Sequence, residues 1–464
     1  MTPDRPYFFC GIGGSGMFPL ALILRARGAK VSGSDRALDQ GRLAEKFAFL
    51  RDAGITLFPQ DGSGVTDANG IVVASAAVED TIPDVAAAEA IGARLMVRAE
   101  LLAELFNASA CSIGVAGTSG KSTTTGMIGW MLADLGLDPT IMNGAVMKNF
   151  AAPDAPFASA LVGKSDIFVS EVDESDGSIA RYTPYIAVVN NIALDHKTMD
   201  ELRVLFGGFV RKAKIAVLNL DNAETAALAN KYPDALTFST RDTKAIYFAD
   251  AIAPMPDGIA FTVHAKGESA SVHLKVPGWH NVANALAALA AVCALNVPLT
   301  KAADALPRFT GIKRRLDVIG TANGVTVIDD FAHNPDKIAA TLATLHDFPG
   351  RLLLMFQPQG FGPLRLMKDQ FIACFADNMR EGDVLSMPEP VYFGGTTDRS
   401  VSSRDIIEGV KRAGREAVAF HDRAQCGEEL LRRAKPGGRI VVMGARDDTL
   451  SQFAAELLKS IADR

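Results

Sequence analysis

The sequence has few of the features that mark secreted, metal-cluster and membrane-spanning proteins. Its five cysteines are scattered through 464 residues without a CxxC pair, so neither a disulfide framework nor a zinc site is indicated. There is no run of 18 apolar residues, and the first residues lead directly into a strand and a glycine loop rather than an apolar signal segment. We therefore expect a cytoplasmic protein with reduced thiols and no membrane span.

An excess of positive charge is also lacking. The net charge of −6 argues against a general electrostatic affinity for nucleic acid or anionic membranes. The composition, 48% hydrophobic and 22% charged, is ordinary for a soluble globular protein, and the length suggests two to four domains. Predicted strands alternate with helices throughout, without an internal repeat, which favours an α/β fold built on parallel sheets.

The most informative stretch is the glycine- and hydroxyl-rich segment 114–125. An apolar run, Cys111–Val115, leads into a glycine turn, a lysine and four hydroxyl residues, followed by an apolar helical pattern over Met127–Leu137. Such a loop holds polyphosphate, because glycines admit backbone N–H groups to phosphate oxygens and the helix N-terminus and lysine add positive charge. Only two residues separate Gly117 from Gly120, unlike the standard G-x-x-x-x-G-K-[ST] loop. The alternative is a structural glycine turn. The candidate phosphate-binding residues are Gly117, Thr118, Ser119, Gly120, Lys121, Ser122 and Thr123.

Two later strands end in residues that suit a metal. The predicted strand Asp166–Ser170 runs into four carboxylates within 171–176, and the strand Ile186–Val189 is followed by Asp195 and His196. Mg²⁺ takes one or two carboxylates and fills its remaining positions with water and phosphate oxygens. The sequence therefore predicts a magnesium site at this sheet edge, with His196 serving metal or phosphate. An acidic turn and a structural histidine are the alternatives.

A second glycine loop lies near the N-terminus. The predicted strand Tyr7–Ile12 runs into Gly11, Gly13 and Gly16, and Asp35 follows about twenty positions later. This layout resembles a dinucleotide fingerprint and predicts a nucleotide or sugar-nucleotide at the loop. Tight packing of a strand on a helix is the alternative. A further strand, 70–74, ends at Ser75.

The last third of the chain offers polar groups at strand and helix ends. His280, Asn281 and Asn284 begin an alanine-rich helix, and their spacing fits a base-reading turn and a capped helix equally well. Arg314 and Arg315 suit phosphate or carboxylate through bidentate hydrogen bonds. The predicted strand 325–328 ends in Asp329, Asp330 and, three residues later, His333. Strands at 352–356, 383–387 and 439–443 complete a third sheet, which is predicted to be parallel.

The order and spacing of these motifs resemble the Mur ligase family over nearly the whole chain. Its members are ATP-dependent enzymes that join an amine to the lactyl carboxylate of UDP-N-acetylmuramate in peptidoglycan synthesis. The resemblance implies three domains: an N-terminal Rossmann-like UDP-binding domain at 1–107, a central P-loop ATPase-type parallel sheet at 108–308, and a C-terminal Rossmann-like domain at 309–464. It also implies the cofactors ATP and Mg²⁺, and a monomer or homodimer.

The resemblance assigns a role to each candidate residue. The residues implied to hold UDP-sugar are Gly11, Gly13, Gly14, Ser15, Gly16, Asp35 and Ser75. Beyond the phosphate loop, the residues implied to hold ATP are His280, Asn281, Asn284, Arg315 and Asp330. The implied magnesium ligands are Ser122, Thr123, Glu171 and His196, and the implied catalytic residues are Lys121, His196, Arg315 and His333. The first glycine loop is thus expected to bind UDP-sugar rather than NAD.

Departures from the family pattern cluster where amine and metal meet. Ser119, Ala193 and Asn334 stand where relatives usually carry histidine, glutamate and histidine, and the loop at 357–362 is less basic. The amine is therefore open between an amino acid, with L-alanine first, and a short peptide such as murein tripeptide. The competing hypotheses are a ligase for a non-muramyl substrate, as in folylpolyglutamate or cyanophycin synthesis, and a nucleotide-sugar-binding regulatory homologue. The second phosphate loop argues against a dehydrogenase.

Overall fold

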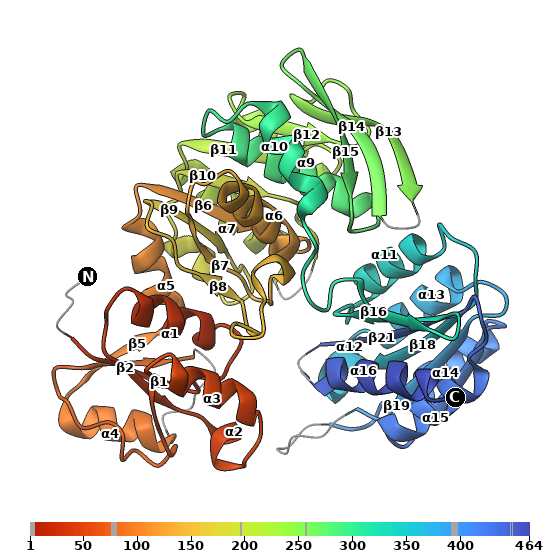
Figure 1. The fold of residues 1–464 in the computed structure, drawn as a ribbon, viewed down its shortest axis with the longest axis horizontal. Coiled ribbons are helices and arrows are strands. Elements are labelled where there is room, and N and C mark those ends of the chain that lie inside the picture. Colours follow the sequence, from red (N-terminus) through yellow and green to blue (C-terminus); the bar gives the residue numbers. More distant parts are fainter. Residues whose placement is uncertain are drawn as a thin grey trace. The chain divides into compact units, whose positions relative to one another are not determined.

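The computed structural model describes residues 5–75, 81–194, 197–255, 258–390, 398–445, 447 and 449–464 (Figure 1). The chain divides into two compact units. The first comprises residues 1–252, 260–274 and 281–310, and the second comprises residues 253–259, 275–280 and 311–464. In the described part of the chain, no helix combines the length and apolar character needed to cross a membrane.

The N-terminal sheet has five parallel strands in the order β3-β2-β1-β4-β5. The strands are β1 (Tyr7–Cys10), β2 (Val31–Ser34), β3 (Thr56–Phe58), β4 (Ile71–Ala74) and β5 (Arg94–Val97). The accompanying helices are α1 (Met17–Ala26), α2 (Arg36–Asp39), α3 (Ala44–Asp52), α4 (Pro83–Ile91) and α5 (Arg98–Asn107). The strand order reverses between β1 and β4. Open α/β sheets bind ligands at such a reversal, outside the carboxyl ends of the strands, and the first glycine loop follows β1 there.

The central sheet has ten strands in the order β15-β14-β13-β12-β11-β10-β6-β9-β7-β8. The run from β13 to β7 is parallel, and β8 joins β7 antiparallel. The first strands in the chain are β6 (Cys111–Ala116), β7 (Thr140–Met142), β8 (Ala160–Leu161), β9 (Ile167–Glu171) and β10 (Ile186–Val189). The later strands are β11 (Ile215–Asn219), β12 (Leu236–Ser239), β13 (Tyr247–Met255), β14 (Gly258–Ala265) and β15 (Glu268–Leu274). Because β6 lies between β9 and β10, the carboxyl ends of these three strands meet.

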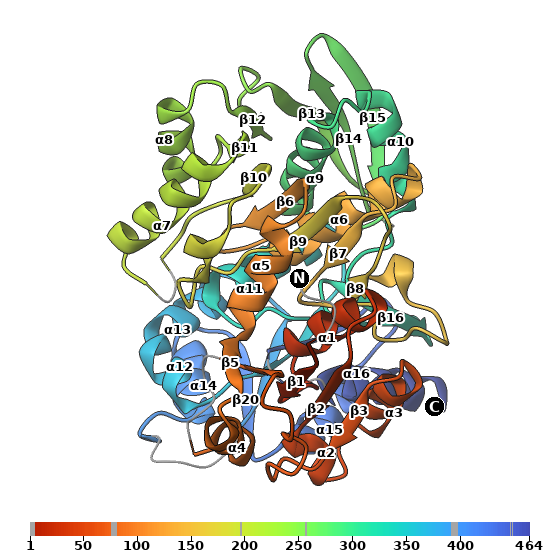
Figure 2. The same ribbon diagram turned by 90° about the vertical axis from the view of Figure 1, so that its left-hand side faces the viewer.

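Helices cover both faces of the central sheet, as a parallel sheet of buried strands requires. Figure 2 shows α7 and α8 on one face and α9 and α10 on the other. The helices are α6 (Lys121–Asp134), α7 (Met199–Lys212), α8 (Ala223–Lys231), α9 (Trp279–Cys293) and α10 (Leu299–Ala305). A capping box formed by Thr198 and Glu201 starts α7, and the Asn222 side chain caps α8. These caps satisfy backbone N–H groups that a helix cannot satisfy internally.

The third sheet belongs to the second unit and has the order β16-β17-β21-β18-β19-β20. Its strands are β16 (Asp317–Ala322), β17 (Val325–Asp330), β18 (Leu352–Gln357), β19 (Val384–Pro388), β20 (Glu416–Phe420) and β21 (Arg439–Gly444). Its helices are α11 (Pro335–Leu345), α12 (Phe361–Leu366), α13 (Lys368–Asn378), α14 (Ser403–Arg412), α15 (Arg423–Arg433) and α16 (Thr449–Ala462). Two apolar clusters, one on each face, pack helices against the strands.

The predicted α/β fold with parallel sheets is confirmed, with one correction in the third sheet. Its first strand, β16, runs antiparallel to β17. The cause is the two-residue turn Asn323–Gly324, in which both residues have positive φ, +48° and +75°. Asn-Gly is the usual sequence of a tight hairpin turn, so this antiparallel edge was predictable from the chain.

A buried carboxylate beside the third sheet, hydrogen-bonded to two backbone N–H groups and a histidine, gives a stability prediction. Asp383, 3% exposed, accepts hydrogen bonds from the Leu352 and Arg380 backbone N–H groups and lies 2.8 Å from His346 Nε2. Asp383→Ala leaves these groups buried without an acceptor and should cost roughly 3 kcal/mol. We expect the thermal midpoint to fall by roughly 5–10 °C. Asp398→Ala, which removes an exposed pair with Arg365, is the control and should shift it by less than about 2 °C. Equal shifts would contradict this interpretation.

Candidate active site

The phosphate loop joins β6 to α6 through two glycines with positive φ. Gly117 has φ +140° and Gly120, the residue before α6, has φ +86°. A Cβ atom on Gly120 would lie 2.4 Å from Asn284 Oδ1 and 2.8 Å from Asn190 Nδ2. The loop therefore requires glycine for both its conformation and its close packing. Its backbone N–H groups and the start of the 14-residue helix α6 form a site suited to phosphate.

The end of β10 holds the loop in place. Asn191 accepts a hydrogen bond from Ser119 N–H at 2.9 Å and donates one to the Ser119 carbonyl at 3.1 Å. The hydroxyl of Thr118 accepts from Ala193 N–H at 3.0 Å. These contacts fix the loop before any ligand arrives, which lowers the cost of binding. Sequence reasoning assigned no role to Asn191. Its place two residues after a buried strand and its place in a motif shared with the family were the available signals.

Lys121 lies within the loop and is held by two acceptors. Its ammonium donates to the Gly117 carbonyl at 2.7 Å and to Glu174 Oε2 at 2.9 Å. Burial opposes the charge on Lys121, but the surrounding carboxylates, led by Glu174, outweigh it and raise the pKa of Lys121 above its ordinary value. Lys121 is therefore a protonated, oriented cation beside the loop, as a phosphate-binding lysine must be.

The predicted magnesium ligands belong to neighbouring elements of the first unit. Ser122 and Thr123 begin α6 and are 9% and 8% exposed. Glu171 ends β9, and its Oε1 accepts from Gly144 N–H at 2.8 Å. Among the described side chains, no three of His, Cys, Asp and Glu form a metal-binding group. A hydroxyl with one carboxylate still fits Mg²⁺, which retains water and phosphate ligands. His196 lies outside the described residues.

Asn284, for which a contact with adenine remains a prediction, is hydrogen-bonded within the protein. Asn284 Oδ1 accepts from Thr124 Oγ1 and Asn190 Nδ2, both at 3.2 Å, and Asn284 Nδ2 donates to Asn281 Oδ1 at 3.0 Å. Its polar atoms are thus used within the protein, at 6% exposure, directly beneath Gly120. Asn284 supports the phosphate loop. His280, at the start of α9, is exposed.

The tight packing at Gly120 leads to a prediction for nucleotide binding. We expect Gly120→Ala to weaken binding of a non-hydrolysable ATP analogue at least tenfold, because the new methyl group must displace Asn190 and Asn284. Calorimetric titration measures the affinity. Gly136→Ala is the control, since Gly136 also has positive φ but no atom within 4 Å of its Cβ position. An unchanged affinity in Gly120→Ala would show that the loop does not hold nucleotide.

In the N-terminal glycine loop, Asp35 has a structural role before any ligand binds. Its Oδ2 accepts from Gly13 N–H at 2.8 Å, and its Oδ1 accepts from Ala37 N–H at 2.8 Å to cap α2. A Cβ atom on Gly13 would lie 2.9 Å from Asp35 Oδ2. Asp35 thus shapes the loop that was predicted to bind UDP-sugar. The remaining loop residues follow β1 and are Gly11, Gly14, Ser15 and Gly16. Ser75 follows β4, the strand that pairs with β1.

In the second unit, the two neighbouring arginines have different environments. Arg314, with φ +61° and 8% exposure, donates to the carbonyls of Gly444 at 2.8 Å and Asp447 at 3.1 Å, and its Nε lies 3.4 Å from Asp329. Arg315 is half-buried, and its guanidinium lies 4.2 Å from the centre of the Phe331 ring. Arg314 therefore stabilises the sheet edge, whereas Arg315 is the arginine that can meet a ligand.

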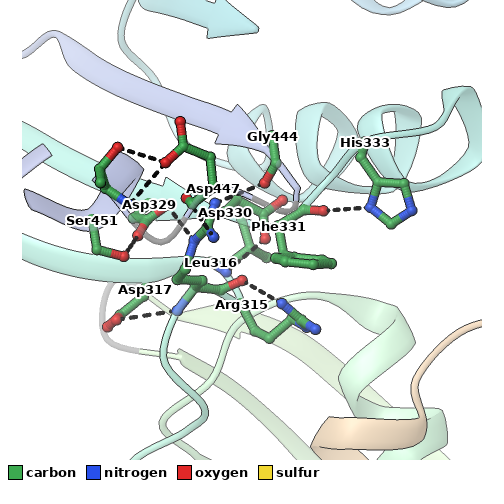
Figure 3. A network of polar contacts seen from close by, with 12 residues as sticks. Arg315, Leu316, Asp317, Asp329, Asp330, Phe331, His333, Gly444, Asp447 and Ser451 are labelled. Atoms are coloured by element: carbon green, nitrogen blue, oxygen red, sulfur yellow. Dashed lines mark hydrogen bonds and ion pairs between the residues drawn. The ribbon is translucent and has the colours of Figure 1, made fainter. Parts of the chain in front are cut away.

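Asp330 and His333 flank Phe331 (Figure 3). Asp330, 6% exposed, accepts from Leu316 N–H at 3.0 Å and from the Thr341 hydroxyl at 2.5 Å. Each oxygen of its carboxylate thus accepts one hydrogen bond inside the unit, and the contact with ribose stays a prediction. His333 Nδ1 lies 2.8 Å from the Phe331 carbonyl, which makes Nδ1 the protonated donor and leaves Nε2 as the acceptor, 3.4 Å from Lys337 Nζ.

These features are typical of an α/β enzyme with a phosphate-type loop in its central sheet and a second, nucleotide-type glycine loop near its N-terminus. Matches to protein families agree with this class. Residues 6–110 match the Mur ligase family catalytic domain, residues 115–292 the Mur ligase middle domain, and residues 314–446 the Mur ligase glutamate ligase domain. The chain belongs to the Mur ligase family.

Individual relatives are similar over almost their whole length. The UDP-N-acetylmuramate–L-alanine ligase of Geobacter sulfurreducens is 34% identical, with 94% of each chain covered, and that of Lachnospira eligens is 32% identical, with 97% covered. Among solved structures, the UDP-N-acetylmuramate-alanine ligase of Thermotoga maritima has a TM-score of 0.81 at 24% identity, covering 98% of this chain and 99% of the other. A murein peptide ligase from Psychrobacter arcticus has a TM-score of 0.71 at 25% identity, covering 99% of each chain.

Proposed function

We propose that this protein is an ATP-dependent ligase of peptidoglycan synthesis that joins L-alanine to the lactyl carboxylate of UDP-N-acetylmuramate, giving ADP and phosphate. The observation that carries the proposal is the similarity to UDP-N-acetylmuramate–L-alanine ligases, at 32–34% identity with 94–97% of both chains covered. The preformed phosphate loop with its protonated lysine supports the ATP part of this reaction.

The chemistry requires activation of a carboxylate, because its leaving group would otherwise be oxide. Transfer of a phosphoryl group from ATP to the carboxylate makes an acyl phosphate, and a bound Mg²⁺ would supply neutralisation of charge on the phosphates. Lys121 binds the β- and γ-phosphates, while Ser122 or Thr123 and Glu171 hold the metal. Arg315 stabilises the transferring phosphoryl group. The amine then attacks the acyl carbon and phosphate leaves, so the protein acts mainly by positioning groups and stabilising charge.

The remaining assignments form part of the same proposal. Residues 1–107 bind the UDP moiety, 108–308 bind ATP, and 309–464 supply Arg315 and His333. The Gly11–Gly16 loop with Asp35 and Ser75 receives the UDP-sugar, and His196 binds the metal or its water shell. ATP lies with its adenine near His280, Asn281 and Asn284 and its ribose near Asp330. We place the reaction in the cytoplasm, where ATP and UDP-sugars are available. The active form is a monomer or homodimer.

An amine screen tests the proposal. Purified protein is mixed with UDP-N-acetylmuramate, ATP and Mg²⁺, and phosphate release is measured with L-alanine, glycine, L-serine or murein tripeptide. We expect release with L-alanine and a product of the corresponding mass. Release only with murein tripeptide would replace L-alanine by a peptide substrate. That second candidate is favoured by the similarity to the Psychrobacter ligase over 99% of both chains. Release only with a non-muramyl carboxylate would overturn the proposal.

A further inference from the structure

The four carboxylates at the end of β9 and in the loop after it have separate structural roles. Glu171 accepts from Gly144 N–H. Asp173 and Asp176 cap turns of their own loop, accepting from Ser175 N–H at 3.0 Å and Ser178 N–H at 2.8 Å. Glu174 alone is hydrogen-bonded to the phosphate-loop lysine, and it is the most buried of the four. Its side chain is 6% exposed, against 18% for Lys121.

This pairing affects how the loop can receive a nucleotide. An ammonium has three N–H donors, and Lys121 directs one to Gly117 and another to Glu174. The third remains for a phosphate oxygen. Removing Lys121 from Glu174 would leave a buried carboxylate unpaired, at considerable cost, so the pair is expected to persist when nucleotide binds. The positive charge of Lys121 is then largely cancelled by its neighbour.

We propose that Glu174 is a positioning residue for the nucleotide: it fixes the Lys121 ammonium against Gly117 and cancels its charge, so that the loop accepts nucleotide as its magnesium complex rather than as the free anion. This inference rests on the proposed ATP site and deepens it. A free triphosphate carries up to four negative charges and would meet Glu174 without compensation, whereas bound Mg²⁺ removes two of them.

Nucleotide binding with and without magnesium tests the inference independently of catalysis. The probe is a non-hydrolysable ATP analogue, titrated calorimetrically in excess Mg²⁺ and again in EDTA. In the wild type we expect much weaker binding in EDTA. Glu174→Gln keeps a hydrogen-bond acceptor for Lys121 but removes the charge. Its affinity in EDTA should rise about tenfold while its affinity in Mg²⁺ changes less than about threefold.

Two further variants separate charge, position and folding. Asp173→Asn removes one negative charge from the same loop, at a residue that does not contact the Lys121 ammonium. It should raise the affinity for the analogue in EDTA less than about threefold. Glu174→Ala removes the anchor as well, and should lower kcat about tenfold below that of Glu174→Gln. Retained binding of UDP-N-acetylmuramate verifies folding in each variant.

The results distinguish this inference from the proposed function. Two results would show that Glu174 does not make nucleotide binding depend on magnesium. One is an unchanged affinity of Glu174→Gln for the analogue in EDTA. The other is an equal rise of that affinity in Asp173→Asn and Glu174→Gln. If the wild type binds the analogue with magnesium but releases no phosphate with any muramyl substrate, the proposed reaction fails while the inference about Glu174 can still be measured. A wild type that binds no adenine nucleotide overturns both.

Discussion

Lys121→Ala should reduce the rate of phosphate release at least a thousandfold, corresponding to about 4 kcal/mol of transition-state stabilisation. The change removes the only side-chain cation that the structure shows within the described phosphate loop 117–123. It also leaves the buried Glu174 carboxylate without its partner, which would repel the incoming phosphates. Steady-state phosphate release with UDP-N-acetylmuramate and L-alanine measures the effect.

Two controls make the result specific to the loop. Binding of UDP-N-acetylmuramate to Lys121→Ala, measured by calorimetry, should stay within about twofold of the wild type, because the proposed UDP site follows another sheet. Lys301→Ala replaces an exposed lysine of α10 and should leave the rate within about twofold. A loss below tenfold in Lys121→Ala would show that the loop does not bind the reacting phosphates.

Arg315→Ala should lower kcat about a hundredfold or more, as expected when a cation that stabilises a transferring phosphoryl group is removed. Arg315→Lys should recover little, because lysine keeps the charge but neither the planar fork nor the stacking on Phe331. The thermal midpoint should fall less in both variants than in Arg314→Ala, since Arg315 is half-buried whereas Arg314 is buried. Rapid-quench measurement of ADP formation separates the phosphoryl-transfer step from product release.

Arg314 is the matched control for Arg315. Its guanidinium is bound to Gly444, Asp447 and Asp329 in the interior of the second unit. Arg314→Ala should therefore lower the thermal midpoint by roughly 5–10 °C, through loss of several buried hydrogen bonds. If the two variants show the reverse pattern, with Arg315 needed for stability and Arg314 for turnover alone, the assignment of the arginines is wrong.

The sequence predicted the elements that local patterns encode. The strand at 7–12 is observed as β1, the strands at 186–189 and 352–356 are observed as β10 and β18, and the phosphate loop joins a strand to a helix. Short strands such as β3 and β7, with three residues each, were missed. Three residues are too few for a hydrophobic period to be visible, so their pairing depends on the neighbouring strands.

Partners far apart in the sequence could not be predicted. Asn284 lies 160 residues from Thr124, and Asn191 lies 72 residues from Ser119, yet each pair is hydrogen-bonded. The sequence also could not tell which of two adjacent arginines is buried. That difference arises from the left-handed backbone of Arg314 and its acceptors at the end of β21.

The departures from the family pattern have local structural accounts at two positions. Asn334 caps α11 by accepting from Lys337 N–H at 3.0 Å, a role for which asparagine is well suited. Ala193 contacts Thr118 through its backbone alone, donating its N–H and accepting at its carbonyl, so this contact places no demand on its side chain. At Ser119 the contacts to Asn191 likewise involve the backbone.

The most direct test of the proposed reaction follows the oxygen atoms of the lactyl carboxylate. If that carboxylate is labelled with oxygen-18, the acyl-phosphate route transfers one labelled oxygen to phosphate in each turnover. We therefore expect mass spectrometry to find singly labelled phosphate, formed in equal amount with an amide of UDP-N-acetylmuramate and L-alanine. Unlabelled phosphate accompanying that amide, or label in AMP, would contradict the proposed mechanism.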